Sequence, residues 1–259
     1  MMLAWCIQNN RVDRATGPIA AAVRESGRLL LDFSFDPRWP IAQQLPNTDA
    51  KRFFYGSSEL IKQLHADRAL RAEIYFDPAT LDHGVWLAQR GAQMLNADGE
   101  ELTLASLAGH IEDGGCFIRP VKDIKAFSGA VVTSDSFAAW RASQQARNSS
   151  LHDEMKVWVA PLKAIDAEYR FVVLDGQIRA GTRYRLGNET SSSPDVPEPV
   201  RVAASKLATG WQSARLNTMD VAQLADGTFR IVEFNCIHTS GLYAVHRPAF
   251  MAAVEEAYA

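Results

Sequence analysis

Two Asp-Gly pairs, each set between runs of strand-forming residues, constrain the fold of this chain more than any other feature. The second pair, Asp226-Gly227, joins the stretches 219–225 and 228–235. Asp-Gly suits a type I′ turn, which needs positive φ at both central residues, so the pair predicts a β-hairpin. A two-residue turn places Asp220 opposite Glu233, and Asn235 shares their face because side chains alternate along a strand.

Two interpretations of this acidic face remain open. Like charges opposite each other destabilise a sheet, and a bound Mg²⁺ would compensate, since it prefers hard oxygen ligands and takes one or two carboxylates. Alternatively, Asp220 and Glu233 are a screened pair on a solvated strand face, and their pairing is lost if the loop is one residue longer. If they face each other across a cation, Asp220→Asn should leave the metal-free fold as stable as before or slightly more so.

The first pair, Asp175-Gly176, predicts a second hairpin that runs from Glu168 to Arg183. A two-residue turn places Glu168 opposite Arg183, with Arg170 on the same face. A cross-strand salt bridge explains Glu168 and Arg183, so Arg170 is the better functional candidate.

The chain before residue 96 alternates short apolar stretches with helical patterns, which indicates a small α/β domain. The expected strands are 3–8, 29–33, 52–55 and 74–76. Either Ser57 or Ser58 is the expected N-cap of the helix that follows the third of these strands.

The polar turn 96–101 is the expected domain boundary, because turn-forming and charged residues interrupt the apolar pattern there. It divides the chain into a domain of residues 1–95 and a domain of residues 96–259. A short helix is expected at 102–111.

A cationic loop follows the apolar stretch that ends in Arg119. Arg119 and Lys125 lie on either side of a turn that ends at the small pair Ser128-Gly129. They suit a polyphosphate clamp, the arginine as a planar fork and the lysine as a point charge, but ordinary surface charge explains them equally simply. A further strand, Lys156 to Pro161, is short, apolar and ended by proline.

Composition excludes several classes of protein. With 259 residues, 47% hydrophobic content and a net charge of −3, the chain resembles an ordinary globular protein, and nucleic acid is an unlikely partner. Its three cysteines lack metal-ligand spacing, which indicates reduced buried thiols. The apolar stretch 1–7 is too short for a signal peptide or a membrane span, so we expect a cytoplasmic protein without membrane contact.

The loop after the Asp226-Gly227 hairpin adds backbone N–H groups at Ser240-Gly241 that suit an oxyanion. His238 in the same loop is either a general base or a purely structural histidine.

Taken together, these segments resemble the ATP-grasp superfamily, and most of all its phage- and bacteria-associated branch with an F-[IV]-R-P…K-x-F-x-G signature, the R-two-K-like clade. The matching segments are 117–129, 156–161, 168–173 and Asp220 with Glu233-Phe234-Asn235. The resemblance implies an ATP-grasp fold of two α+β lobes with antiparallel sheets that hold ATP between them. The first 95 residues look like a divergent version of the small α/β domain that precedes this core.

The resemblance also implies roles for individual residues, with ATP and Mg²⁺ as cofactors. Those that would hold Mg²⁺ against the ATP phosphates are Asp220, Glu233 and Asn235. Those that would bind the nucleotide are Arg119 and Lys125 at the phosphates, the hinge strand Lys156, Trp158, Val159 and Ala160 at the adenine, and Glu168 near the ribose. Arg170 and Arg183 would be catalytic, with Arg170 near the γ-phosphate or an acyl phosphate.

Two positions depart from the family pattern. Many ligases of the superfamily have an arginine two residues before the metal aspartate, where this chain has Thr218, so Arg170 or Arg183 would substitute for it. The hinge lacks its usual acidic residue, since Ala160 and Pro161 stand in its place.

By resemblance, the function is ATP-dependent ligation of a carboxylate to an amine or thiol through an acyl phosphate. The substrate would be a small molecule or peptide that carries a carboxylate. Two alternatives remain open: a kinase that phosphorylates a hydroxyl, suggested by Thr218, and a non-catalytic ATP-binding module.

Overall fold

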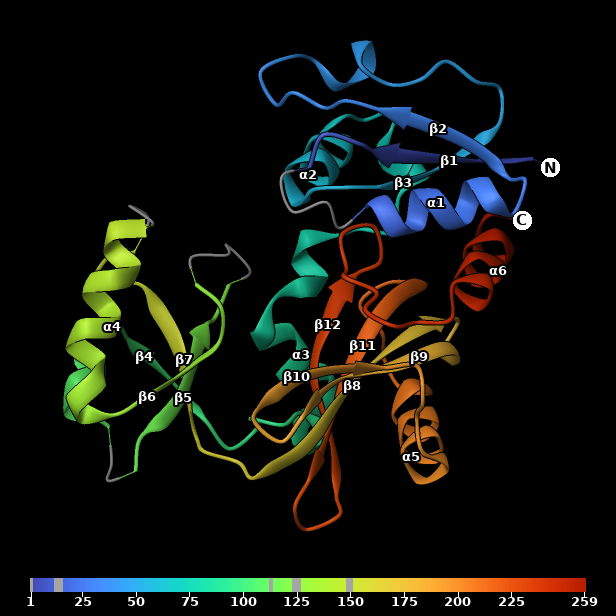
Figure 1. Cartoon of the computed structure of the whole chain (residues 1–259). Coiled ribbons are helices and arrows are strands. Elements are labelled where there is room, and N and C mark those ends of the chain that lie inside the picture. The colour runs from blue at the N-terminus through green and yellow to red at the C-terminus, as the bar shows by residue number, and fades with distance from the viewer. Residues whose placement is uncertain (1, 12–15, 112–113, 123–126, 148–150) are drawn as a thin grey trace. The chain divides into compact units, whose positions relative to one another are not determined.

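The computed structural model of the chain describes residues 2–11, 16–111, 114–122, 127–147 and 151–259 (Figure 1). The chain folds into two compact units, each assembled from separate stretches of sequence. The first contains Met1–Asp77, Ala167–Val221 and Phe234–Ala259, and the second contains Pro78–Asp166 and Ala222–Glu233. The domains 1–95 and 96–259 are a different division, made along the chain, and they stay a prediction.

The first unit begins with a three-stranded parallel sheet. β1 (Leu3–Gln8) lies in the middle, between β2 (Leu29–Phe33) and β3 (Lys51–Tyr55). Residues 4–8 of β1 are all buried, as expected for a central strand covered on both faces. The first three predicted strands are therefore confirmed. The fourth, at 74–76, was wrong: this stretch is irregular, and the backbone N–H of Tyr75 donates to the ring of His238 instead of to a strand.

Helices follow β1 and β3. α1 (Gly17–Glu25) lies between β1 and β2 in the chain, and α2 (Ser58–Ala66) follows β3. Parallel neighbours such as β1 and β2 need a long crossover connection, and α1 supplies it. Ser57 is confirmed as the N-cap of α2, because its hydroxyl oxygen accepts a hydrogen bond from the backbone N–H of Leu60 at 3.2 Å.

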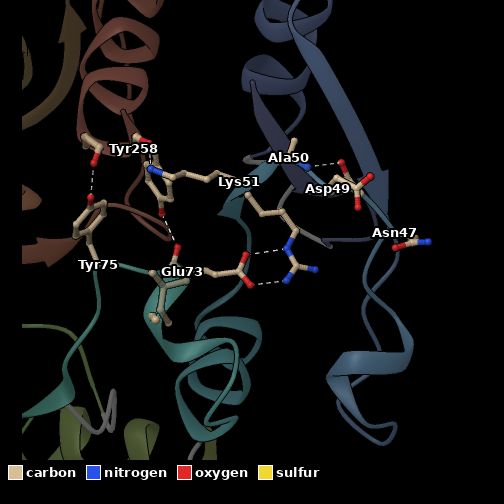
Figure 2. Close-up of a pocket in the computed structure, with 12 residues that line it drawn as sticks. Asn47, Asp49, Ala50, Lys51, Glu73, Tyr75 and Tyr258 are labelled. Atoms are coloured by element: carbon tan, nitrogen blue, oxygen red, sulfur yellow. Dashed lines mark hydrogen bonds and ion pairs between the residues drawn. The ribbon is translucent and has the colours of Figure 1, made fainter. Parts of the chain in front are cut away.

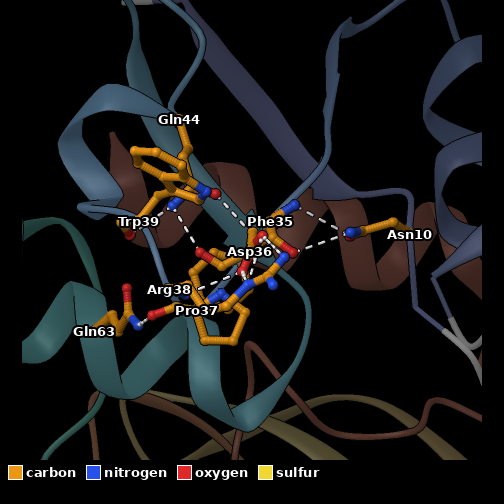
Figure 3. A network of polar contacts seen from close by, with 8 residues as sticks. All are labelled: Asn10, Phe35, Asp36, Pro37, Arg38, Trp39, Gln44 and Gln63. Carbon is orange, nitrogen blue, oxygen red and sulfur yellow. Dashed lines mark hydrogen bonds and ion pairs between the residues drawn. The ribbon is translucent and has the colours of Figure 1, made fainter.

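The long loop between β2 and β3, which includes the 3₁₀ helix η1 (Ile41–Gln43), is held by side-chain amides (Figure 3). The Gln44 carboxamide accepts from the backbone N–H of Asp36 at 2.7 Å and donates to the carbonyl of Trp39 at 2.7 Å. The Asn10 carboxamide pairs in the same way with both backbone groups of Phe35. These amides satisfy backbone groups that no strand or helix satisfies.

The hairpin of β8 (Ile165–Leu174) and β9 (Gln177–Leu186) has the predicted two-residue turn. Asp175 and Gly176 both have positive φ, at 51° and 71°, and Leu174 pairs with Gln177. Two register shifts follow, one between Val172 and Val173 and one between Glu168 and Tyr169. The hairpin is confirmed, but its register near Glu168 differs from the prediction.

The hairpin of β11 (Leu216–Leu224) and β12 (Phe229–Cys236) has a longer turn than predicted. The backbone N–H of Leu224 donates to the carbonyl of Thr228, and the N–H of Gly227 donates to the carbonyl of Leu224. Gly227 has a φ of 81°, whereas Asp226 does not have positive φ. This is a three-residue turn with a bulged glycine, and not a type I′ turn. The turn therefore no longer implies that Asp220 and Glu233 lie opposite each other.

These two hairpins and β10 (Glu189–Ser193) form an antiparallel sheet in the order β10-β9-β8-β11-β12. Most of this sheet lies in the first unit, together with helices α5 (Glu198–Ala208) and α6 (Arg247–Tyr258) and the 3₁₀ helix η2 (Arg71–Glu73), whereas Ala222–Glu233 belongs to the second unit. One core of buried residues joins the parallel sheet to the antiparallel sheet, through Trp5, Phe53, Val172, Leu216 and Phe250 among others.

The second unit is built on a four-stranded sheet in the order β4-β7-β5-β6. Its strands are β4 (Glu100–Thr103), β5 (Cys116–Pro120), β6 (Ala130–Val132) and β7 (Lys156–Pro161). Its helices are α3 (His83–Arg90), α4 (Ser134–Arg147) and the 3₁₀ helices η3 (Pro78–Leu81), η4 (Gly91–Gln93) and η5 (Ser106–Gly109). The helix expected at 102–111 was wrong, since its first residues belong to β4 and only a single 3₁₀ turn follows.

One face of this sheet is apolar and packs against α4. Ile118, Val157 and Val159 lie in one buried cluster with Phe137 of α4. Their neighbours along the strands, Arg119 and Trp158, therefore project from the opposite face. Mixed helices with antiparallel sheets confirm the predicted α+β class. Across the described parts of the chain, no helix is both long and apolar enough to cross a membrane.

Candidate functional site

Arg170 and Asp220 form a buried ion pair in the first unit. Nε and Nη2 of Arg170 donate to Oδ1 and Oδ2 of Asp220, both at 2.7 Å. Arg170 is 7% exposed and Asp220 is 1% exposed. A planar guanidinium that engages both carboxylate oxygens is the strongest geometry for such a pair. The structure thus brings together one predicted catalytic residue and one predicted metal ligand.

Two tyrosines cover this guanidinium. The Arg170 Cζ lies 5.8 Å from the ring centroid of Tyr184 and 5.3 Å from that of Tyr243. The two rings stack at 5.1 Å with planes 15° apart, and Nη1 of Arg170 donates to the carbonyl of Gly241 at 3.0 Å. Arg170 is therefore held by hydrogen bonds on one side and by aromatic faces on another.

Glu168 lies in the same network but with a different partner from the predicted one. It pairs with Arg185 across the strands, where Nη1 is 2.5 Å from its Oε1, and it accepts from the Tyr184 hydroxyl at 2.6 Å. The predicted pairing with Arg183 was wrong because the two register shifts move Glu168 along β9.

Arg183 is separated from the other predicted residues of this hairpin. It pairs with Tyr169, whereas Arg170 pairs with Thr182, so Arg183 and Arg170 project from opposite faces of the sheet. Its Nη2 lies 3.4 Å from the Ser191 hydroxyl. Arg183 remains a predicted catalytic residue, but it does not share a face with Arg170.

In the second unit, Arg119 and Trp158 are direct cross-strand neighbours on β5 and β7. Nη2 of Arg119 lies 3.7 Å from Oε2 of Glu233, and its Cζ lies 4.9 Å from the ring centroid of Trp86. The indole N–H of Trp158 donates to the carbonyl of Asn96 at 2.8 Å. The structure thus places a predicted phosphate-binding residue beside a predicted metal ligand and a hinge residue.

Sequence reasoning missed the helix that covers this face. His83 and Trp86, three residues apart and so on one side of α3, lie against Trp158 and Arg119. The His83 imidazole is 2% exposed, meets Trp158 edge-on at 5.2 Å, and has no hydrogen-bond partner within the described part of the chain. Burial, and then the charge of Arg119, lowers the pKa of His83 to about 3, so the ring is neutral.

The hinge strand has an edge that is only partly paired with β4. The pairing of β4 with β7 runs from Lys156 to Val159, and β7 continues for two residues, Ala160 and Pro161, beyond the last of these pairs. Lys156 points to a surface carboxylate instead, with Nζ 3.4 Å from Oε1 of Glu101. Gly99, the residue before β4, lies so close to the Val159 carbonyl oxygen that a Cβ there would be 2.4 Å from it, so the adenine role of this strand stays a prediction.

His238 is structural. It is completely buried, its Nδ1 lies 2.7 Å from the carbonyl of Phe54, and its Nε2 accepts from the N–H of Tyr75 at 2.9 Å. Burial lowers its pKa from 6.5 to about 4. Because both ring nitrogens are hydrogen-bonded inside the first unit, the general-base interpretation has no support.

The predicted metal ligands are chemically suited to Mg²⁺. Asp220, Glu233 and Asn235 each carry a hard oxygen atom, the kind of ligand that Mg²⁺ prefers. No three His, Cys, Asp or Glu side chains gather to hold a metal in the described residues. Two carboxylates and an amide would need phosphate oxygens and water to complete the coordination. Lys125 lies outside the described residues.

A pocket of about 640 Å³ beside β3 contains none of the predicted site residues (Figure 2). Its charged groups serve the fold: Nζ of Lys51 caps α6 by donating to the carbonyl of Tyr258 at 2.6 Å, and Arg52 forms a two-pronged ion pair with Glu73. We therefore assign it no part in the site.

Comparison with known proteins supports the fold. The solved structure of the D-cycloserine synthetase DcsG matches with 14% identity over 99% of both chains and a TM-score of 0.58. D-alanine–D-alanine ligase from Bacillus anthracis matches with 12% identity, 98% and 92% coverage and a TM-score of 0.58. The ATP-grasp ligase PsnB, solved with a phosphomimetic variant of minimal precursor, Mg and ADP, matches with 16% identity, 98% and 97% coverage and a TM-score of 0.52.

No curated protein sequence matches the chain. The model of an ATP-grasp domain family, family 3 of the R-two-K clade, matches residues 59–254, which is most of the chain. The predicted ATP-grasp fold and clade are confirmed, although the signature motif itself is not shown. This chain belongs to family 3 of the R-two-K clade of ATP-grasp domains.

Proposed function

We propose that the protein is an ATP- and Mg²⁺-dependent ligase that joins a carboxylate to an amine or thiol. The observation that carries this proposal is the Arg170–Asp220 pair, which provides a fixed cation next to a predicted metal ligand. Thr218, where many ligases of the superfamily have arginine, is buried and hydrogen-bonded to Ser240. Arg170 reaches Asp220 from the neighbouring strand and supplies the missing charge.

In the proposed reaction, an oxygen of the substrate carboxylate attacks the γ-phosphorus of ATP, and ADP leaves. The amine or thiol then attacks the carbonyl carbon of the acyl phosphate, phosphate leaves with its bonding electrons, and the proton of the amine or thiol passes to water. Arg170 and Arg119 would stabilise the negative charge on the transferring phosphoryl group, and Mg²⁺ held by Asp220, Glu233 and Asn235 would do the same as a Lewis acid.

The substrate would be a small molecule or a peptide with a carboxylate. PsnB was solved with a precursor and D-alanine–D-alanine ligase is named for a small amino acid, so the fold accommodates both classes. Adenine would lie beside the hinge strand, near Val159 and Ala160, with Glu168 at the ribose.

Calorimetric titration of ATP and ADP, with and without Mg²⁺, tests this proposal. We expect ATP to bind only with Mg²⁺, and Glu233→Gln to weaken binding on the order of tenfold to a hundredfold, because a metal ligand is lost. The exposed Glu154→Gln is the matched control and should bind as the wild type does. A wild-type protein that binds no nucleotide under any of these conditions would contradict the proposal.

Phosphorylation of a hydroxyl is the second candidate, and it is motivated by Thr218. Hydroxylamine distinguishes the two reactions because it traps an acyl phosphate as a hydroxamate. ADP formation on an acid with hydroxamate accumulation would establish the ligase, whereas a stable phosphate ester without hydroxamate would establish the kinase.

A further inference from the structure

We propose that the open edge of strand β3 and the pocket beside it bind an extended segment of a partner protein, one that carries a basic side chain. The pocket of about 640 Å³ lies within the first unit and contains none of the residues predicted to bind nucleotide or metal. The inference therefore does not depend on the proposed ligase reaction.

The backbone of β3 alternates between its neighbour β1 and the outside of the sheet, because β3 is an edge strand in the order β2-β1-β3. Nδ1 of His238 lies 2.7 Å from the carbonyl oxygen of Phe54, and the N–H of Gly56 donates to the carbonyl of His238 at 2.9 Å. Even-numbered residues thus face outward. The N–H and C=O of Arg52, two residues before Phe54, point the same way.

Arg52 is the residue at which this edge is open. Its N–H and C=O make no hydrogen bond outside the sheet to any described residue. The N–H of Ala50 is already taken by the Thr48 hydroxyl at 3.1 Å, and His238 occupies the edge at Phe54. A donor and an acceptor side by side on a strand edge fit the C=O and N–H of one residue of another extended chain. The open edge therefore specifies a backbone as its ligand.

The pocket provides room for such a segment. It is lined by residues 47–52 at the start of β3, by residues 72–75 and by the end of α6 (Figure 2). Arg52 and the two residues before it belong to this lining. The volume falls within the range of about 300–1,000 Å³ that is usual for ligand pockets.

The charges around the pocket favour a basic segment. Nε of Arg52 donates to Oε2 of Glu73 at 2.7 Å, so these two charges are paired. The Lys51 ammonium donates to the carbonyl of Tyr258 at 2.6 Å, at the negative end of helix α6. Asp49 is the remaining charged residue of the lining, and it is exposed and pairs with no cation among the residues that the structure describes. A lysine or arginine on the bound segment would complement this carboxylate.

Selection from a phage-displayed library of random decapeptides, with the wild-type protein as the target, tests this inference. We expect enrichment of sequences that combine β-branched residues with a lysine or arginine. The most enriched peptide, synthesised with blocked ends, is then compared with copies that carry a single backbone N-methyl group. At least one copy should bind roughly tenfold more weakly, because methylation removes the N–H that pairs with the Arg52 carbonyl.

Variants of the protein locate the binding. Arg52→Pro removes the outward N–H and keeps the ladder with β1, so it should weaken binding by roughly tenfold or more. Arg52→Gln is its control, since it removes only the pair with Glu73 and should bind as the wild type does. Asp49→Asn should weaken binding by about threefold to tenfold. Asp135→Asn, at an exposed position of the second unit, should change nothing.

Circular dichroism establishes which variants are folded, and the N-methylated peptides decide the question if Arg52→Pro unfolds. Absence of enrichment, or equal binding to the wild type and to folded Arg52→Pro, would overturn the inference, as would equal binding of every N-methylated copy. A dimer of the wild type that Arg52→Pro abolishes would instead assign the edge to a second copy of the chain. ATP-dependent modification of the peptide would make it a substrate and would equally overturn the assignment to a partner.

Discussion

Asp220→Asn is expected to lower the free energy of unfolding by about 3–5 kcal/mol in metal-free buffer, because it leaves the buried Arg170 guanidinium without its counter-charge. The sequence alone predicts the opposite, since an acidic pair relieved of one charge should be no less stable. The buried arginine reverses the expected direction of the stability change. Denaturant unfolding followed by circular dichroism, with a chelator present, measures the difference.

Asp226→Asn is the matched control for this prediction. Asp226 is an exposed turn residue whose Oδ1 accepts from the backbone N–H of Thr228 at 2.9 Å, and asparagine keeps that oxygen. We expect its unfolding free energy to stay within about 0.5 kcal/mol of the wild type. If Asp220→Asn unfolds at the same denaturant concentration as this control, then the Arg170 pair adds nothing to stability.

The protein is also expected to lose about 2–3 kcal/mol of stability between pH 7 and pH 4.5 through His238 alone. Its pKa falls from 6.5 to about 4 on folding, because burial disfavours the charged ring and the hydrogen bond to the Phe54 carbonyl offsets only part of that effect. A depressed pKa stabilises the fold above the unfolded value near 6.5, and that stability is lost as the pH falls towards 4. His83 in the second unit, with a pKa of about 3, acts in the same direction.

Unfolding free energies at the two pH values, for the wild type and for His238→Asn, measure this contribution. Asparagine keeps a donor near the Phe54 carbonyl but does not titrate. The variant should therefore be less stable than the wild type at pH 7, and its free energy of unfolding should fall less on acidification. His152→Gln, at an exposed position, should keep the wild-type slope. A variant whose stability falls as steeply as that of the wild type would exclude His238 as a source of the pH dependence.

The two Asp-Gly pairs show how far local sequence determines a hairpin. Both were predicted as type I′ turns and both form hairpins, but only Asp175-Gly176 has positive φ at both residues. In the other, the Asp226 carboxylate accepts from both the N–H and the hydroxyl of Thr228, which fixes a three-residue turn. Asp-Gly is compatible with either turn geometry, so the contact of Asp226 with Thr228 selects the longer turn.

The candidate site was less accessible to sequence reasoning because its contacts are long-range. Alternation along β8 identified Arg170 as the residue without an explained role, but its partner lies fifty residues away in the chain. Register shifts inside the hairpin change the cross-strand partner of Glu168 from Arg183 to Arg185, and no local sequence pattern predicts such a shift. His83 and Trp86 belong to a helix that sequence analysis did not connect with the hinge strand at all.

Tyr243 shows what this arrangement demands of the backbone. It has a φ of 46°, a left-handed conformation that costs a non-glycine residue about 1–3 kcal/mol, and it is 41% exposed. Glycine would relax that backbone, but it would also remove the ring that covers Arg170 and stacks on Tyr184. At this residue, relief of backbone strain by glycine and retention of the aromatic ring over Arg170 are therefore opposed.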